Sequence, residues 1–247
     1  MTYFDRYISH VEFSKDDKNL AFILRNGFQE YNVAVFDFLE KKPRKICQEK
    51  FNFEISSIAF MPRDSSKLLI SGENLFQLYQ CGRIGLAEQP EFDDIPKKQA
   101  QLVSGTKMSQ HFTASCYTEN TDQLIGCSNM GDIFVIEVMG VVQVIKQSQL
   151  ISPSSEPGTR LNLKFCVSCR FGFLAASKDV IYFFKLNAKR SGKPTYQCIL
   201  RWRAPEFEES HITSLSIQEG GDKSPEIECN LAIATKNNQI MYLNLYK

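Results

Sequence analysis

The sequence has little net charge and no long apolar run. Lysine and arginine number 29 against 28 aspartate and glutamate residues, which gives a formal charge of +1. So small a charge provides no global field that would attract a polyanion, and this argues against generic nucleic-acid binding. No segment approaches the apolar length of a membrane span, and residues 1–7 lack the apolar core of a signal peptide. We therefore expect a protein that is neither secreted nor inserted in a membrane.

Motifs that identify common enzymes are also missing. The sequence has neither the glycine-rich spacing of a P-loop nor a Gly-x-Ser-x-Gly elbow, and it has only three histidines. Its eight cysteines occur without any Asn-x-Ser/Thr sequon, which favours reduced, buried thiols and a cytosolic compartment. The hydrophobic share of 43% is enough for a substantial core.

A repeat of about fifty residues is the main pattern in the chain. Its clearest copy places Ile55, Ile58 and Phe60 before a turn that carries Pro62 and Asp64, which resembles the opening of a WD repeat. Related openings begin at residues 8, 55, 112, 163 and 212, separated by 47, 57, 51 and 49 residues. Each opening is followed by two more short apolar runs joined by a tight turn, such as the turn at Gly131.

These runs predict a sheet that meanders outward from a central axis. Outermost strands are expected at 45–47, 141–144 and 198–200. Because the runs are apolar on both faces, each sheet needs a neighbour on either side. We predict an all-β fold, a WD40-like β-propeller of about five four-stranded blades. It forms a single domain over 1–247, with blades near 8–49, 55–90, 112–147, 161–203 and 211–247. A β-sandwich is the alternative.

The fifth copy lacks a fourth strand, which leaves two ways to close the ring. Residues 2–7 could supply that strand and close a five-bladed propeller, or the five blades could be part of a larger ring. We favour the larger ring. Without its remaining blades, the five blades form an open arc, and the two end blades of that arc would expose apolar faces.

Candidate catalytic and metal-binding residues are isolated. Cys166 and Cys169 form one Cys-x-x-Cys, but residues three apart on a strand point to opposite faces, so we expect structural thiols. His111 and His211 each precede the first apolar position of a repeat, which indicates an architectural role. His10 lies inside the first strand, out of register with both.

Acidic and basic groups fall in expected loops. A propeller glycosidase would need paired carboxylates, and the densest acidic groups are Asp93 with Asp94 and the set from Glu206 to Glu209. We expect these residues to be solvated, and we predict no enzymatic activity, cofactor or metal. Basic residues that could contact an acidic partner are Lys41, Lys42, Arg44, Lys45, Lys97, Lys98, Lys189, Arg190 and Lys193. The long irregular stretches 82–110 and 148–160 are further candidate contact loops.

The order of the blades resembles the cilia- and flagella-associated WD-repeat proteins. The similarity includes the Pro-x-Asp turn and Phe-x-Leu strand within 55–80, the Gly-Asp turn and Ile-Phe-Val-Ile strand within 112–137, and the segments 171–186 and 231–245. The only tryptophan, Trp202, is not in a third strand, so the Trp-Asp pair of the family is reduced to Phe36-Asp37. No coiled coil follows the blades.

The resemblance implies a scaffold of the ciliary or flagellar axoneme. Its expected partners are the inner dynein arm or its regulatory complex and the doublet microtubule, with further propeller blades from another segment or chain. Alternatives are a general cytoplasmic WD40 scaffold and, from a different class, a five-bladed hydrolase. Acidic side chains converging on the axis would favour the hydrolase.

Overall fold

The chain forms an all-β structure. The computed structural model describes residues 6–27, 29–39, 44–82, 85–88, 111–118, 121, 123–137, 140–151, 160–187, 194–203, 210–219 and 227–246. Within these residues the regular structure is β-strand, apart from one 3₁₀ turn, η2 (Gln147–Gln149). The strands form five antiparallel sheets, each made of consecutive strands, which we name blades 1 to 5 in chain order.

The bounds of the strands follow the repeat. Blade 1 contains β1 (Arg6–Phe13), β2 (Asn19–Asn26), β3 (Glu30–Asp37) and β4 (Arg44–Phe51). Blade 2 contains β5 (Ile55–Met61), β6 (Asp64–Gly72), β7 (Leu75–Gly82) and β8 (Gly85–Glu88). Blade 3 contains β9 (Phe112–Tyr117), β10 (Leu124–Ser128), β11 (Ile133–Glu137) and β12 (Gly140–Ile145). Blade 4 contains β13 (Phe165–Cys169), β14 (Gly172–Ala176), β15 (Ile181–Asn187) and β16 (Thr195–Trp202). Blade 5 contains β17 (Ile212–Glu219), β18 (Ile227–Thr235) and β19 (Ile240–Tyr246).

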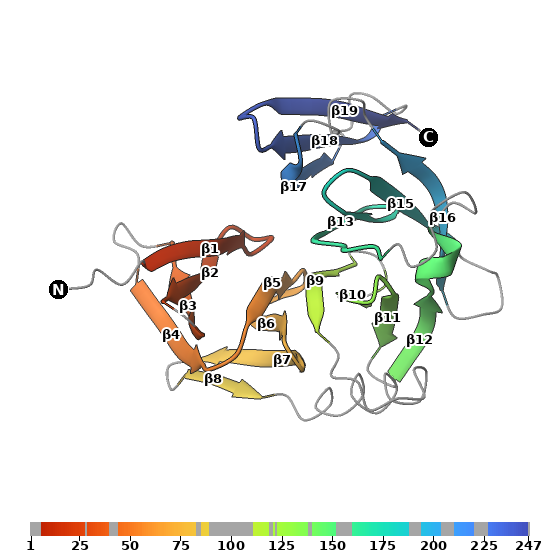
Figure 1. Cartoon of the computed structure of the whole chain (residues 1–247). Helices are drawn as coiled ribbons and strands as arrows, with labels where there is room; N and C mark the ends of the chain where they lie inside the picture. The colour runs from red at the N-terminus through yellow and green to blue at the C-terminus, as the bar shows by residue number, and fades with distance from the viewer. Residues whose placement is uncertain are drawn as a thin grey trace.

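The blades are arranged radially around one axis. Figure 1 shows the first strand of each blade nearest the centre and the later strands farther out. The predicted WD40-like β-propeller of about five blades is therefore confirmed. Four blades have four strands, and blade 5 has three within the described residues. The predicted outermost strands lie inside β4, β12 and β16.

The hydrophobic core lies between blades rather than inside one of them. Four separate clusters join blade 1 to blade 2, blade 2 to blade 3, blade 3 to blade 4 and blade 4 to blade 5. All five residues of β10, and all five of β14, are buried, as expected of strands covered on both faces. This radial order excludes the sandwich alternative, whose core would lie between two facing sheets.

The turns explain why the chain reverses where it does. Gly131 has a φ of 80°, and its N–H donates to the carbonyl of Ser128 in the turn between β10 and β11. A side chain at Gly131 would also collide with the Gln147 side chain and with Leu161. The predicted glycine turn is thus required by both conformation and packing.

The arc is open between blade 5 and blade 1. Figure 1 shows β17 to β19 on one side of an opening and β1 on the other, and none of the four clusters joins these two blades. Tyr7 pairs with Arg25 in β2, so residues 6 and 7 belong to blade 1 and do not complete blade 5. Residues 2–5 lie outside the described part of the chain.

One predicted irregular segment contains a strand. Gly85–Glu88 forms β8 and pairs with residues 79–82 of β7, although the stretch 82–110 was expected to be irregular. Four residues are too few to show a period, and the pairing depends on the preceding strand. In blade 4 the first strand begins at Phe165, two residues after the start of the repeat at Leu163.

Candidate functional site

The five innermost strands surround an axial cavity. Its volume is about 460 Å³, and residues of β1, β5, β9, β13 and β17 line it together with Lys15, Pro62 and Lys164. Serine, alanine and aliphatic or aromatic side chains dominate the lining. Glu12 is the one carboxylate among the residues that line it. A glycosidase needs two carboxyl groups at a defined separation, and this lining provides one.

A cluster of buried serines fixes blade 2 against blade 3 beside the axis. The Ser57 hydroxyl lies 2.8 Å from that of Ser71 and 2.7 Å from that of Ser115, and the hydroxyls of Ser71 and Ser115 are 3.1 Å apart. All three residues are buried. Because hydroxyls both donate and accept, the three side chains satisfy one another without water, which suits a structural contact.

Glu12 and His10 are the titratable groups of β1 that line the cavity. Burial raises the pKa of Glu12 to about 7. Burial also lowers the pKa of His10, and a hydrogen bond with the Ser9 backbone offsets part of that shift. Two such groups on one strand do not by themselves make a catalytic pair, which needs a nucleophile or a second acid positioned at the same atom.

The histidines at the repeat starts have equivalent backbone hydrogen bonds. The carbonyl of His111 accepts from the backbone of Asn129, and the carbonyl of His211 accepts in the same way from Lys236. Each bond ties the start of an innermost strand to the turn that follows the second strand of its blade. The His111 ring lies 2.8 Å from the Ser56 hydroxyl in blade 2. The shared bonds involve the backbone carbonyls alone, so the architectural role of the two imidazole rings stays a prediction.

The cysteines pack between blades. Cys166 packs against the cluster between blades 3 and 4, whereas Cys169 belongs to the cluster between blades 4 and 5, so the two thiols point to opposite faces as predicted. Sequence reasoning missed a different pair: Sγ of Cys116 lies 3.1 Å from Sγ of Cys166. Burial and this contact raise the pKa of Cys166 well above its usual range, which makes it a poor nucleophile.

Another thiol pair lies between blades 1 and 2, where a hydrogen bond with Cys47 and burial raise the pKa of Cys81. Within the described residues no group of three His, Cys, Asp or Glu side chains is arranged to hold a metal ion. The carboxylates considered for glycosidase chemistry, Asp93, Asp94, Glu206, Glu208 and Glu209, lie outside the described residues.

Most of the predicted basic contact residues also lie outside the described part of the chain. These are Lys41, Lys42, Lys97, Lys98, Lys189, Arg190 and Lys193. Arg44 and Lys45 are exposed, but they are the first residues of β4 rather than part of a turn. Lys45 Nζ donates to Gln48 at 3.3 Å. The outer edge of blade 1 therefore carries two accessible cations on a strand.

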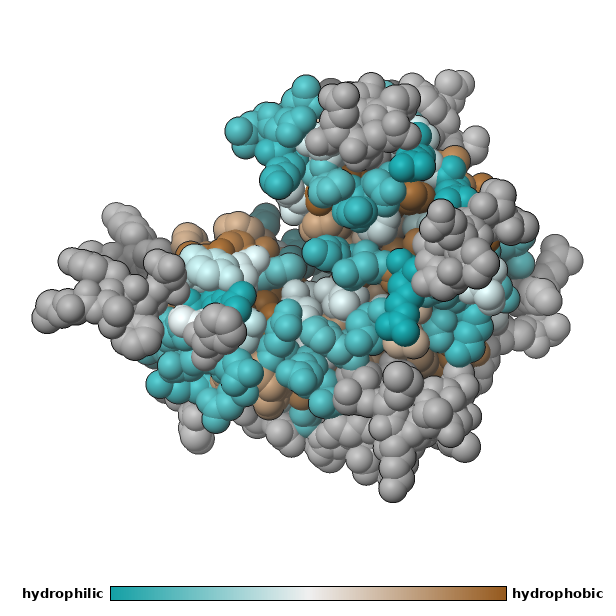
Figure 2. All heavy atoms as spheres, viewed as in Figure 1, coloured by the Kyte–Doolittle hydropathy of each residue, from teal (hydrophilic) through white to brown (hydrophobic). Residues whose placement is uncertain are grey.

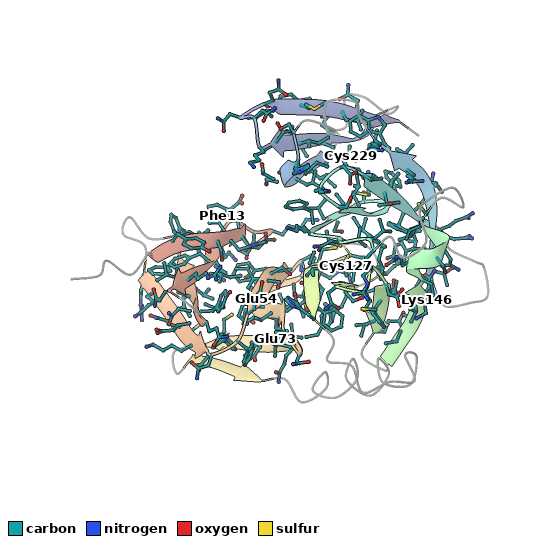
Figure 3. The ribbon with its side chains drawn as sticks, viewed as in Figure 1. Phe13, Glu54, Glu73, Cys127, Lys146 and Cys229 are labelled. Atoms are coloured by element: carbon teal, nitrogen blue, oxygen red, sulfur yellow. The ribbon has the colours of Figure 1, made fainter. Side chains whose placement is uncertain are left out.

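Exposed apolar side chains gather on blade 1. In β1 the exposed fractions are 54% for Ile8, 51% for Val11 and 54% for Phe13. Figure 2 shows hydrophobic atoms along the side of this blade that faces the opening, and Figure 3 shows the Phe13 side chain at the same side of β1. Soluble monomers rarely expose contiguous apolar side chains of this size without a partner.

The fold resembles a solved β-propeller. The crystal structure of the Cps50 (Swd1) β-propeller domain of Myceliophteria thermophila matches with a TM-score of 0.63 and 12% sequence identity, over 96% of this chain and 68% of that one. At this identity the similarity concerns the fold alone, and it supports the WD40-like class. No family model matches the sequence, and no curated protein matches it. The described residues form no helix with the length and hydropathy of a membrane span.

Proposed function

We propose that this chain is a non-enzymatic scaffold that binds other proteins through the surfaces of its blades. The axial lining is the observation that carries the proposal. This lining is mostly hydroxyl and apolar side chains with a single carboxylate, whereas a glycosidase site needs two carboxyl groups. A rigid arc of blades also presents several separate edges and faces to partners.

The finer proposal is a scaffold of the ciliary or flagellar axoneme that docks the inner dynein arm or its regulators on doublet microtubules. The resemblance of the blade order to the cilia- and flagella-associated WD-repeat proteins supports it. Arg44 and Lys45 at the exposed outer edge of blade 1 add a surface suited to an acidic partner. A general cytoplasmic scaffold without a ciliary role is the alternative.

Salt extraction of isolated axonemes followed by immunoblotting tests the location. We expect the chain to stay with the axoneme at low salt and to be released at higher salt, because exposed charge pairs are screened. Recovery in the soluble cell body alone would contradict the axonemal proposal and favour the general scaffold.

A charge-reversal pair tests the edge of blade 1. Lys45→Glu should weaken rebinding to extracted axonemes, whereas Lys236→Glu makes the same charge change in the exposed turn between β18 and β19 and should leave rebinding unchanged. Equal rebinding of the two variants would show that the outer edge of blade 1 is not a contact.

A further inference from the structure

The repeat shows which side chains of blade 1 ought to be covered. Val11 and Phe13 occupy the positions that Ile58 and Phe60 occupy in blade 2. The blade 2 residues are only 3% and 5% exposed because they pack against blade 1. In blade 1 the equivalent residues are 51% and 54% exposed. The surface that is buried between neighbouring blades elsewhere in the chain is therefore exposed on blade 1, which has no blade before it within the described residues.

The face that carries Val11 and Phe13 extends over the first three strands of blade 1, where Leu20, Phe22 and Phe36 are half-buried. Val11 pairs with Phe22, and Phe13 pairs with Leu20, which in turn pairs with Phe36. The rings of Phe22 and Phe36 are stacked, with centroids 5.4 Å apart. Residues directly opposite on antiparallel strands share a face, so these side chains form one aromatic and aliphatic surface.

The outer strand β4 places polar side chains along the rim of this surface. Lys45 pairs with Phe36, Gln48 with Ala34 and Lys50 with Asn32, so all three β4 side chains share the bare face. The amide of Gln48 donates to buried Asn32 at 3.3 Å. A covering sheet would meet apolar groups near the axis and, at the rim, Lys45 and Gln48, while Lys50 is paired with Glu30 at 3.2 Å.

Blade 5 ends in a different bare face. Ser216, Ala232 and Tyr242 pair in register across β17, β18 and β19, and Ile240 lies on the same face. Tyr242 is 76% exposed and Ile240 is 63% exposed. Ser216 and Ala232 on the first two strands are small, and only β19 carries large apolar side chains on this face. The small side chains leave room for bulkier groups from a neighbouring sheet.

The interfaces inside the chain show how such faces are covered. Between blades 1 and 2, Ile23 and Val33, together with Tyr31 and Phe51, meet Phe60 and Tyr79. Between blades 3 and 4, a face with Ile133 meets aromatic groups in the same way. The aromatic face of blade 1 resembles that of blade 4, which blade 3 covers with aliphatic side chains.

The opening has room for about two blades. Five blades span 68% of the matched propeller domain, which leaves space for about two more in a ring of the same curvature. A second copy of this chain would bring five blades, so it does not fit the opening in the plane of the ring.

We propose that the opening between β1 and β17 to β19 is a docking site for about two β-propeller blades of another polypeptide. The blade against blade 1 presents an aliphatic face with acidic or acceptor groups on its outer strand. The blade against blade 5 presents bulky apolar side chains. The partner thus completes a ring that this chain leaves open. The inference deepens the proposed scaffold function and does not depend on a ciliary location.

Photo-crosslinking tests the site. Benzoylphenylalanine replaces Phe13 in one variant and Tyr242 in another, and each purified chain is irradiated in an extract of the cells in which it occurs. Ile199, which is 52% exposed on the outer strand of blade 4, is replaced in a control variant. We expect adducts at 13 and 242 with two neighbouring blades of the same polypeptide, identified by peptide mass spectrometry, at yields about tenfold above the control.

A charged variant tests whether one insert covers both faces. Val11→Glu places a carboxylate on the innermost strand of the blade 1 face. Because Val11 is half exposed, the change should leave circular dichroism and the melting temperature of the isolated chain nearly unchanged. In the complex it should lower the adduct yield at position 242 by about tenfold, since a buried unpaired charge prevents docking.

Three results would overturn the inference. These are adducts between copies of this chain, adducts with peptides that are not propeller blades, and yields at 13 and 242 no higher than at 199. None of them bears on axoneme extraction, so failure of the docking site and failure of the axonemal proposal are separate outcomes. If Val11→Glu left the yield at 242 unchanged, the two faces would not share one insert, and the proposal would be wrong.

Discussion

The same amino acid at equivalent places in two blades allows a matched stability test. Phe13→Ala and Phe60→Ala remove one benzyl side chain each, from the third apolar position of the first strand of blades 1 and 2. Phe60 is 5% exposed, so its loss should cost about 3–5 kcal/mol of unfolding free energy. Phe13 is 54% exposed, so less than half of its surface is covered and its loss should cost about 1.5–2.5 kcal/mol.

The difference of about 2 kcal/mol is large enough to measure. For a chain of this length it corresponds to a melting temperature about 4–8 °C lower for Phe60→Ala than for Phe13→Ala. Urea titration of both variants, with the slope compared to that of the unmodified chain, checks the same difference. Equal losses would mean that the isolated chain already covers Phe13, through ring closure or self-association, and the reasoning about the open end would be refuted.

Three further changes test the interior. Ser57→Ala should lower the free energy of unfolding by about 1–2 kcal/mol, because Ser71 and Ser115 lose their shared partner. An unchanged midpoint in urea titration would show that the serine cluster does not link the blades. Gly126→Ala should lower the free energy of unfolding by about 1–3 kcal/mol, since a Cβ there would lie 2.7 and 2.9 Å from two phenylalanine rings between blades 2 and 3. A melting temperature within a degree of the original would show that this interface is loosely packed. Burial raises the folded pKa of Glu12 to about 7, so its contribution to stability should fall as pH rises from the unfolded pKa near 4.5 to about 7, whereas His10, whose folded pKa is lowered, contributes in the opposite direction. Over this range stability should therefore fall less, or rise more, with pH in Glu12→Gln than in the unmodified chain, and equal slopes in the two would refute the role of Glu12.

The repeat alone was sufficient to predict the blades. Positions such as Ile58 and Phe60 recur at a spacing that only a sheet with two buried faces explains, and the turn at Gly131 needs a positive φ. The equivalent backbone bonds of His111 and His211 followed from their equal places in the repeat. Local pattern and repeat spacing carry this information because each blade pairs only strands adjacent in sequence.

Contacts between blades could not be predicted in the same way. Cys116 and Cys166 are 50 residues apart, and their contact depends on how far the first strand of blade 4 rotates against that of blade 3. The serine cluster likewise joins two strands of one blade to the first strand of the next. The strand β8 is too short to show alternation. The thiol and serine contacts depend on the relative placement of two sheets, which spacing does not encode, whereas β8 pairs within its own sheet and was missed because it is short.

The sequential pairing of strands has a consequence for synthesis on the ribosome. Blade 1 can form as soon as residue 51 has emerged, but its Ile23 and Val33 side chains stay exposed to water until Leu68 and Ile70 have been synthesised. At elongation rates of about 5–20 residues/s this interval lasts roughly 1–4 s. Each later blade repeats the same delay, so the nascent chain always exposes the apolar face of its most recently formed blade. Holdase chaperones should bind this face as each blade is translated.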